Sequence, residues 1–271
     1  MRYSFRSSPP LLPFLQLPMF QSFKTSLTFK SALFALFFVM LSNLLLQAEE
    51  AQNTEDEATK ENSASVKEVS PGVFQIGQVT FNQKNRRISF PTTLNMSEGL
   101  LEFAIVHIDG KIHESLLSTT VSAFNLNLAL KLLRYPESPE LFQILDEDFR
   151  QTGRYPEVSE EVKTGARVKI LVSWEADGKK HENLINDWIY HSTLEKAMPA
   201  TPWLNHGSYV YENQFKAEVM GELVAIFLSR SSIFNFAGED NHIDEPWIVF
   251  SEKVPPAGTP VTVTIAPLLE K

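Results

Sequence analysis

The sequence predicts an α+β fold for residues 70–271, in which a mostly antiparallel β-sheet carries two or three inserted helices. Short apolar stretches rich in β-branched side chains recur along this part of the chain, as strands do. Asp-Gly pairs, which favour tight hairpin turns, follow two of these stretches. Two longer apolar stretches follow residues that can cap a helix. Because strands outnumber helices, we expect the helices to pack on the sheet.

The first expected strands surround two turns. Residues 78–81 and 86–91 form short strands on either side of a polar turn. Residues 100–108, LLEFAIVHI, form a stronger strand because they are apolar and partly β-branched. Asp109-Gly110 then predicts a hairpin turn, and residues 111–117 are expected to form the return strand.

Two helices are expected next. The first covers residues 121–134, with Thr119 or Thr120 as its capping residue. Its apolar side chains nearly encircle it, so we expect it to be deeply buried across the sheet. The second begins at Ser138-Pro139-Glu140, which combines a capping serine, a proline at the first helical position and an early acid, and it ends near Thr152-Gly153.

The remaining expected elements are strands and loops. Residues 166–175 alternate cleanly between apolar and polar side chains, and Asp177-Gly178 predicts a second hairpin turn after them. Residues 182–191 fit either a strand or a short helix. The last part of the chain is expected to contain a three-stranded meander over 208–228, a loop over 229–246 and a closing strand over 261–265.

Residues 1–48 are predicted to be a signal peptide. Lys24 and Lys30 precede an apolar run that ends before Ala48, a small residue suited to cleavage. The run is shorter than the roughly 20 residues that a spanning helix needs, although an uncleaved N-terminal anchor remains the alternative. Residues 49–69 are polar and acidic and predict a disordered linker. We therefore expect an exported protein of the periplasm or cell envelope.

Charge and cysteine content exclude several classes of function. The formal net charge is −9, and residues 1–48 contribute only basic side chains, so the remainder is more acidic still. An acidic surface repels a phosphate backbone, so we expect no nucleic-acid partner. The absence of cysteine excludes disulfides, thiolate nucleophiles and cysteine-ligated iron–sulfur clusters. We expect no cofactor, apart from a divalent metal ion in the alternatives described next.

One short stretch occurs twice, as DGKIHESLL at 109–117 and DGKKHENLI at 177–185. Shared hairpin chemistry explains the similarity, and an ancient duplication is a second explanation. A third is that His113 and His181 converge with their neighbouring glutamates as ligands of one metal ion. Because neighbours on a strand face opposite sides, the His and Glu of one copy could both point inward only at a bulge.

The usual catalytic motifs are incomplete in the first copy. The stretch that starts at His113 lacks the second histidine of a helical HExxH zinc motif. Ser115 lacks a GxSxG elbow and a histidine oriented by a carboxylate, so a packing or capping role is favoured over a nucleophile.

A second candidate metal site lies in GEDNHIDEPW, residues 238–247. Asp240, His242 and Asp244 alternate as cation ligands can, but the stretch lacks the glycine and terminal glutamate of an EF-hand loop. A solvated acidic loop is the simpler interpretation. His206, between Trp203 and Tyr209, is expected to be a packed histidine rather than a ligand.

Several separated stretches occur in the order seen in one protein family. They are GKIHESLL, NLNLALKLL, a strand ending in Trp174, WLNHGS, GELVAIF, an acidic loop before Trp247, and PPAGTPVTVTI. Over residues 75–267 the chain thereby resembles the YdjY-like domain of exported bacterial proteins. The resemblance implies a single domain in the cell envelope and no defined activity. It also implies a candidate ligand or partner site at the matching positions, which are His113, Glu114, Ser115, Trp203, Gly207 and Ser208.

Two functional hypotheses follow. The first is a non-enzymatic exported module that binds an envelope protein or a small ligand through its hairpins and the 229–246 loop. The alternative is a metal-dependent, hydrolytic enzyme that uses His113 and Glu114 with a second histidine or acid. We expect membrane contact only through an uncleaved N-terminal segment.

Overall fold

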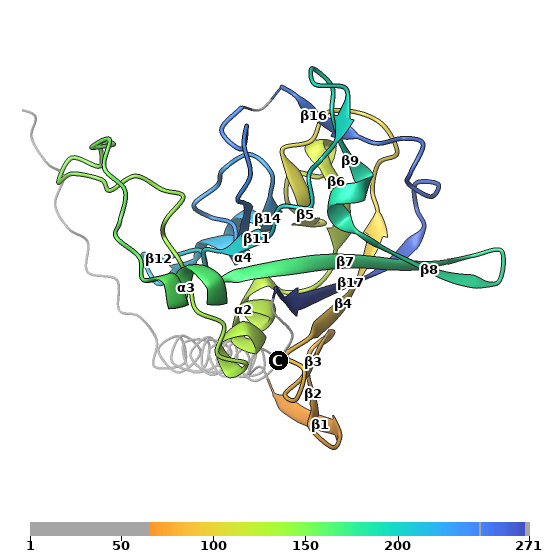
Figure 1. Ribbon diagram of the computed structural model, residues 1–271. Helices are drawn as coiled ribbons and strands as arrows, with labels where there is room; N and C mark the ends of the chain where they lie inside the picture. The colour runs from red at the N-terminus through yellow and green to blue at the C-terminus, as the bar shows by residue number, and fades with distance from the viewer. Residues whose placement is uncertain (1–64, 244, 269–271) are drawn as a thin grey trace, which may run out of the picture. The chain divides into compact units, whose positions relative to one another are not determined.

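The structure is a computed structural model that describes residues 65–243 and 245–268 (Figure 1). These residues are mainly β-structure with few helices, as the sequence predicts, but the sheet is not open. Eight strands form a closed, barrel-like ring because the last strand pairs again with the first. In order around the ring they are β4 (Ile88–Leu94), β17 (Pro260–Pro267), β7 (Arg167–Ala176), β11 (Trp203–Asn205), β15 (Phe234–Phe236), β14 (Glu222–Ala225), β5 (Phe103–His107) and β6 (Ser115–Thr119).

The pair β5–β6 corrects the hairpin predicted at Asp109-Gly110. After the turn, η1 (Ile112–Glu114) forms a short 3₁₀ helix in place of the first half of the expected strand. The chain thereby returns to the start of β5, so that Ser115 pairs with Phe103 and the two strands are parallel. On its other side β6 pairs with β4, and this contact closes the ring. The expected antiparallel sheet therefore also contains parallel pairs, of which β14–β15 is another.

The second copy of the repeated stretch does form a hairpin. β7 continues through Asp177 and Gly178, at φ of 52° and 70°, into β8 (Lys179–Leu184). Two successive residues at positive φ are typical of the tight turn that Asp-Gly favours. The two copies therefore have different structures, and the similarity is not a structural repeat.

Further strands flank the ring. β1 (Val66–Ser70), β2 (Val73–Ile76) and β3 (Val79–Asn82) extend the sheet from β4. All of β1 except Ser70 lies inside the range predicted as a disordered linker, so the folded part begins before the expected boundary at residue 70. The predicted signal peptide and the earlier part of that linker lie outside the described residues. A smaller sheet contains β10 (Lys196–Ala197), β9 (Ile189–His191) and β16 (Trp247–Val249), and a separate hairpin contains β12 (Val210–Tyr211) and β13 (Gln214–Phe215).

The described residues contain three α-helices, α2 (Ala123–Leu132), α3 (Glu160–Gly165) and α4 (Lys216–Met220). The cap of α2 is Ser122, whose hydroxyl accepts a hydrogen bond from the Asn125 amide, rather than Thr119 or Thr120. Thr119 instead donates to the Pro91 carbonyl on β4. None of the described helices is long and apolar enough to cross a membrane.

The second expected helix, from Ser138, is wrong. Ser138 is buried and its amide donates to the Asn205 carbonyl. Further along, the Asp146 carboxylate accepts hydrogen bonds from the amides of Asp148 and Arg150. Local side-chain bonds of this kind compete with helix formation, and residues 144–154 form an irregular hairpin in its place.

The core fills the inside of the ring. Val168, Ile170 and Val172 of β7 are completely buried, as the alternation of this strand predicts. Equivalent positions of β4 and β17, such as Phe90 and Val263, are buried beside them. The intervening residues of these three strands consequently face outward.

Candidate functional site

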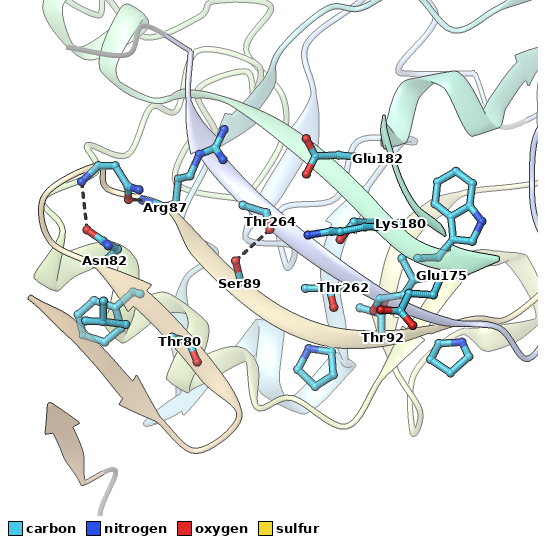
Figure 2. A pocket seen from close by; sticks show the side chains of 18 residues that line it. Thr80, Asn82, Arg87, Ser89, Thr92, Glu175, Lys180, Glu182, Thr262 and Thr264 are labelled. Carbon is cyan, nitrogen blue, oxygen red and sulfur yellow. Dashed lines mark hydrogen bonds between the residues drawn. The ribbon is translucent and has the colours of Figure 1, made fainter. Parts of the chain in front are cut away.

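A groove of about 810 Å³ lies on the outer wall of the ring (Figure 2). Its floor is formed by β4, β17 and β7, which are neighbours in the sheet, and it extends onto β3 on one side and β8 on the other. Six of the 18 lining residues carry a hydroxyl, namely Thr80, Ser89, Thr92, Ser173, Thr262 and Thr264.

Strand register arranges five of these hydroxyls, all except that of Thr92, in two rows. Thr80, Ser89 and Thr264 are register partners on three neighbouring strands. Thr262 and Ser173 are partners in the second row, which continues to Glu182 on β8. Sheet geometry separates neighbours within a row by about 4.8 Å and the two rows by about 7 Å. The outer wall therefore presents a regular array of short polar side chains.

Part of this array is already hydrogen-bonded. The hydroxyls of Ser89 and Thr264 lie 2.9 Å apart, and the Thr92 hydroxyl donates to the Val261 carbonyl at 2.9 Å. Among the described residues, the hydroxyls of Thr80, Ser173 and Thr262 have no such partner. Thr262 is exposed, Thr80 is half-buried and Ser173 is 9% exposed. A hydroxyl both donates and accepts, so these side chains can bond to a ligand without a change in protonation where the ligand reaches them.

The groove lining contains two acidic and two basic side chains, whose formal charges sum to zero. Glu175 and Lys180 are register partners beside the β7–β8 turn, and Glu182 lies further along β8. Arg87 lies at the opposite end, next to the turn that precedes β4. Trp174 and His181 are also register partners in this hairpin, where their rings stack at 5.1 Å, and Trp174 belongs to the groove lining. The groove lining contains no histidine and offers hydrogen-bonding recognition rather than acid–base chemistry.

The predicted residues His113, Glu114 and Ser115 do not form a ligand pocket. His113 lies on η1 with its side chain 77% exposed, and its Nε2 lies 3.8 Å from Glu114. Ser115 is completely buried, and its hydroxyl donates to the Lys111 carbonyl. Ser115 therefore ties η1 to β6, which agrees with the packing role expected for it.

Glu114 instead belongs to a cluster of three carboxylates around one lysine. The Lys111 Nζ lies 3.6 Å from Glu102, 3.7 Å from Glu114 and 4.0 Å from Glu222. Burial, followed by repulsion from Glu114, raises the pKa of Glu102. The buried Glu222 also accepts a hydrogen bond from Ser229. The stretches GKIHESLL and GELVAIF thus meet here, in an ion cluster that joins η1, β5 and β14.

A smaller cavity of about 250 Å³ lies beside this cluster and is lined by His107, Asp109 and Glu218. Its polar groups bond to the protein itself. Glu218 accepts hydrogen bonds from the Ser122 hydroxyl and the Phe124 amide at the start of α2. His107 Nδ1 accepts a hydrogen bond from the Asp109 amide. These contacts hold the chain ends of α2 and β5 in place.

Trp203, Gly207 and Ser208 have structural roles. Trp203 is completely buried and donates through its ring nitrogen to Asn186. Gly207 adopts a φ of 81°, and an added Cβ atom there would lie 2.2 Å from Glu137. The Ser208 hydroxyl accepts a hydrogen bond from the Ala217 amide in the first turn of α4. None of these three residues lines the groove.

The predicted metal ligands are held by different partners. His181 stacks on Trp174, His113 pairs with Glu114, and Asp240 pairs with His191 at 3.1 Å. Asp244 lies outside the described residues, and no contact joins His242 to the others in the described part of the chain. Within residues 65–243 and 245–268, no three His, Cys, Asp or Glu side chains are grouped so that they could hold a metal ion.

The pair His191–Asp240 was not expected from the sequence. His191 Nδ1 accepts a hydrogen bond from the Leu194 amide, so Nε2 carries the proton that is donated to Asp240. The Trp247 ring nitrogen donates to the Asp240 carbonyl. With both ring nitrogens used, His191 fastens the acidic loop to the smaller sheet rather than acting as a base.

His206 is packed, as the sequence predicts. Its ring lies 4.3 Å from that of Phe142, and Nδ1 lies 3.5 Å from the Ser138 carbonyl oxygen, to which it can donate. Burial lowers the pKa of His206. This residue therefore remains neutral where an exposed histidine would begin to gain a proton.

No family model, curated protein or solved structure matches this chain. The groove is larger than the cavity beside Glu218, and its geometry is the basis for the function proposed below.

Proposed function

We propose that the chain is an exported, non-enzymatic binding module of the bacterial cell envelope and that its ligand lies in the groove on the outer wall. The observation that carries this proposal is the two-row array of hydroxyl side chains across β3, β4, β17 and β7. The resemblance to YdjY-like domains and the predicted N-terminal signal support a location in the periplasm or cell envelope. An uncleaved N-terminal segment would additionally hold the module at a membrane.

A binding role fits the groove better than catalysis does. Its hydroxyls lie on paired strands, and the lining contains no histidine next to them that could remove a proton. Of the residues considered for a hydrolytic enzyme, Ser115 is buried and Glu114 pairs with Lys111. The groove can therefore recognise a ligand by shape and hydrogen bonds, as non-enzymatic modules do.

Hydrogen–deuterium exchange with a detergent-solubilised envelope extract of the producing organism tests the proposal. We expect slower exchange in two turns at the ends of the groove, residues 82–87 and 175–180. The variant Thr264→Arg fills the groove and should remove this protection. Thr193→Arg, at an exposed position outside the groove lining, is the matched control and should retain it. Protection elsewhere only, or protection unchanged by Thr264→Arg, would contradict the proposal.

A further inference from the structure

We infer that the ligand of this groove is an uncharged glycan chain that lies across the strands. The inference rests on the proposed function and names the class of ligand for the same site. Four features of the groove support it, namely the hydroxyl array, the paired backbone beneath it, the balance of charge and the proline rings in and beside the second row.

The array matches a ligand that carries hydroxyls at regular intervals. Thr80, Ser89 and Thr264 succeed one another from strand to strand, and Thr262 and Ser173 repeat this arrangement one row away. The step within a row is about 4.8 Å, and this is similar to the length of a sugar ring in an extended chain. A glycan that crosses the strands between the rows would present hydroxyls along both of its edges. Each of these could donate to and accept from the protein.

The backbone below the groove is not available for recognition. β17 pairs with β4 over residues 260–265 and with β7 over residues 262–267, so its amides and carbonyls are used within the sheet. An extended peptide gains most of its affinity for a sheet by adding a strand to a free edge. The centre of a sheet face offers side chains only, and here six of these carry hydroxyls. This favours a polyhydroxylated chain over a peptide.

The charges of the groove favour an uncharged ligand. Lys180 lies opposite Glu175 in the hairpin, so the two compensate each other directly. Glu182 on β8 and Arg87 beside β4 also line the groove and leave no excess of either sign. A polyanion such as a uronic-acid polymer would meet two carboxylates as well as two cations and gain little from them.

Proline rings contribute to the apolar part of the site, together with Val73, Phe81, Trp174 and Val261. Pro91 is the register partner of Thr262, and Pro260 lies two residues from Thr262 along β17. Both are exposed and both line the groove. The flat faces of sugar rings carry C–H groups, which pack on such apolar surfaces while the ring edges form hydrogen bonds. The alternation of apolar and hydroxyl side chains is therefore suited to a carbohydrate.

Isothermal titration of the chain as the cell produces it tests the inference. The probes are the uncharged cellohexaose, maltohexaose and chitohexaose and the anionic hexagalacturonate. We expect at least one uncharged oligosaccharide to bind. Thr262→Val and Ser173→Ala should each weaken that binding roughly 2- to 10-fold, the range expected for one lost hydrogen bond. Thr193→Val, an exposed control outside the groove lining, should leave it unchanged.

The outcomes separate this inference from the proposed function. If hexagalacturonate alone binds and Thr262→Val weakens it, the groove is a binding site but the inference about its ligand is wrong. The inference about the ligand is also wrong if none of the four oligosaccharides binds while the envelope extract still slows hydrogen–deuterium exchange in the turns of the groove. If the extract gives no protection either, both proposals are overturned. Binding that is equal in Thr262→Val, Ser173→Ala and the parent would place the sugar elsewhere and contradict the inference.

Discussion

Tyr135 provides a stability prediction that can be worked out from its contacts. The side chain is only 3% exposed, and its hydroxyl donates to the Arg86 carbonyl at 2.7 Å. The Arg86 guanidinium lies 4.2 Å from the centre of the tyrosine ring and donates to the carbonyls of Leu133 and Arg134. Tyr135 and Arg86 together therefore join the end of α2 to the turn before β4.

The variant Tyr135→Phe removes one hydrogen bond and keeps the ring. The loss of a buried hydrogen bond costs about 1 kcal/mol net, and an acceptor left without a partner adds to this cost. The contact between the ring and Arg86 persists because phenylalanine also attracts a cation. Burial raises the pKa of Tyr135 to about 12, so the hydroxyl remains a donor at neutral pH. We expect the free energy of unfolding to fall by about 1–2 kcal/mol.

Urea unfolding at pH 7, followed by tryptophan fluorescence, measures this change. Tyr155→Phe is the matched control, because Tyr155 is 55% exposed and its hydroxyl has no hydrogen bond to the described residues. The control should stay within about 0.5 kcal/mol of the parent. If Tyr135→Phe is no less stable than Tyr155→Phe, the proposed link between α2 and β4 does not contribute to stability.

Three further predictions concern buried or tightly packed groups. The raised pKa of Glu102 means that folding disfavours the ionised form of this side chain. Its contribution to the free energy of unfolding is therefore most favourable below the ordinary pKa of 4.5 and is lost as the pH rises. Glu102→Gln should consequently raise the urea midpoint at pH 7 but not at pH 3.5. The lowered pKa of His206 gives the opposite pH dependence, because its contribution to stability is present above pH 6.5 and is lost as the pH falls. His206→Gln should therefore reduce the loss of stability between pH 7.5 and pH 5.5. Gly221 has a φ of 68°, and an added Cβ atom would lie 2.9 Å from the Gly110 backbone, so Gly221→Ala should lower the free energy of unfolding by about 1–3 kcal/mol in the same titration. An unchanged midpoint or slope in any one variant would contradict the explanation given for that residue.

Local pattern was sufficient to predict the strongest strands. In β7 the alternation correctly predicts that Val168, Ile170 and Val172 face inward, although Ser173, expected outward, is only 9% exposed and Trp174, expected inward, is half-buried. The closing strand expected over 261–265 is present as β17. The ring closure could not be predicted, because it depends on pairing between β4 and β6, and the Asp109-Gly110 turn favours a hairpin that would have kept the sheet open. At Ser138 a correct capping pattern was overridden by tertiary contacts, since its amide bonds to Asn205.

The candidate groove could be predicted only in part. The sequence marks Ser173 as an outward residue of its strand, and the threonines of VTVTI alternate with buried valines in the same way. Whether these outward hydroxyls form a binding site depends on which strands become neighbours in the fold. Ser89 and Thr264 bond to each other although 175 residues separate them. The chemistry of the histidine-containing stretches is recognisable from the sequence, whereas scattered hydroxyls form a site only when the fold makes their strands neighbours.

Threonine methyl NMR tests the role of the groove most directly. Titration of the methyl-labelled chain with the envelope extract should shift the signals of Thr80, Thr262 and Thr264, which line the groove. Thr193 and Thr201, which do not line it, should keep their positions. Shifts confined to threonines outside the groove, with Thr262 and Thr264 unchanged at saturation, would contradict the assignment of this wall as the binding site.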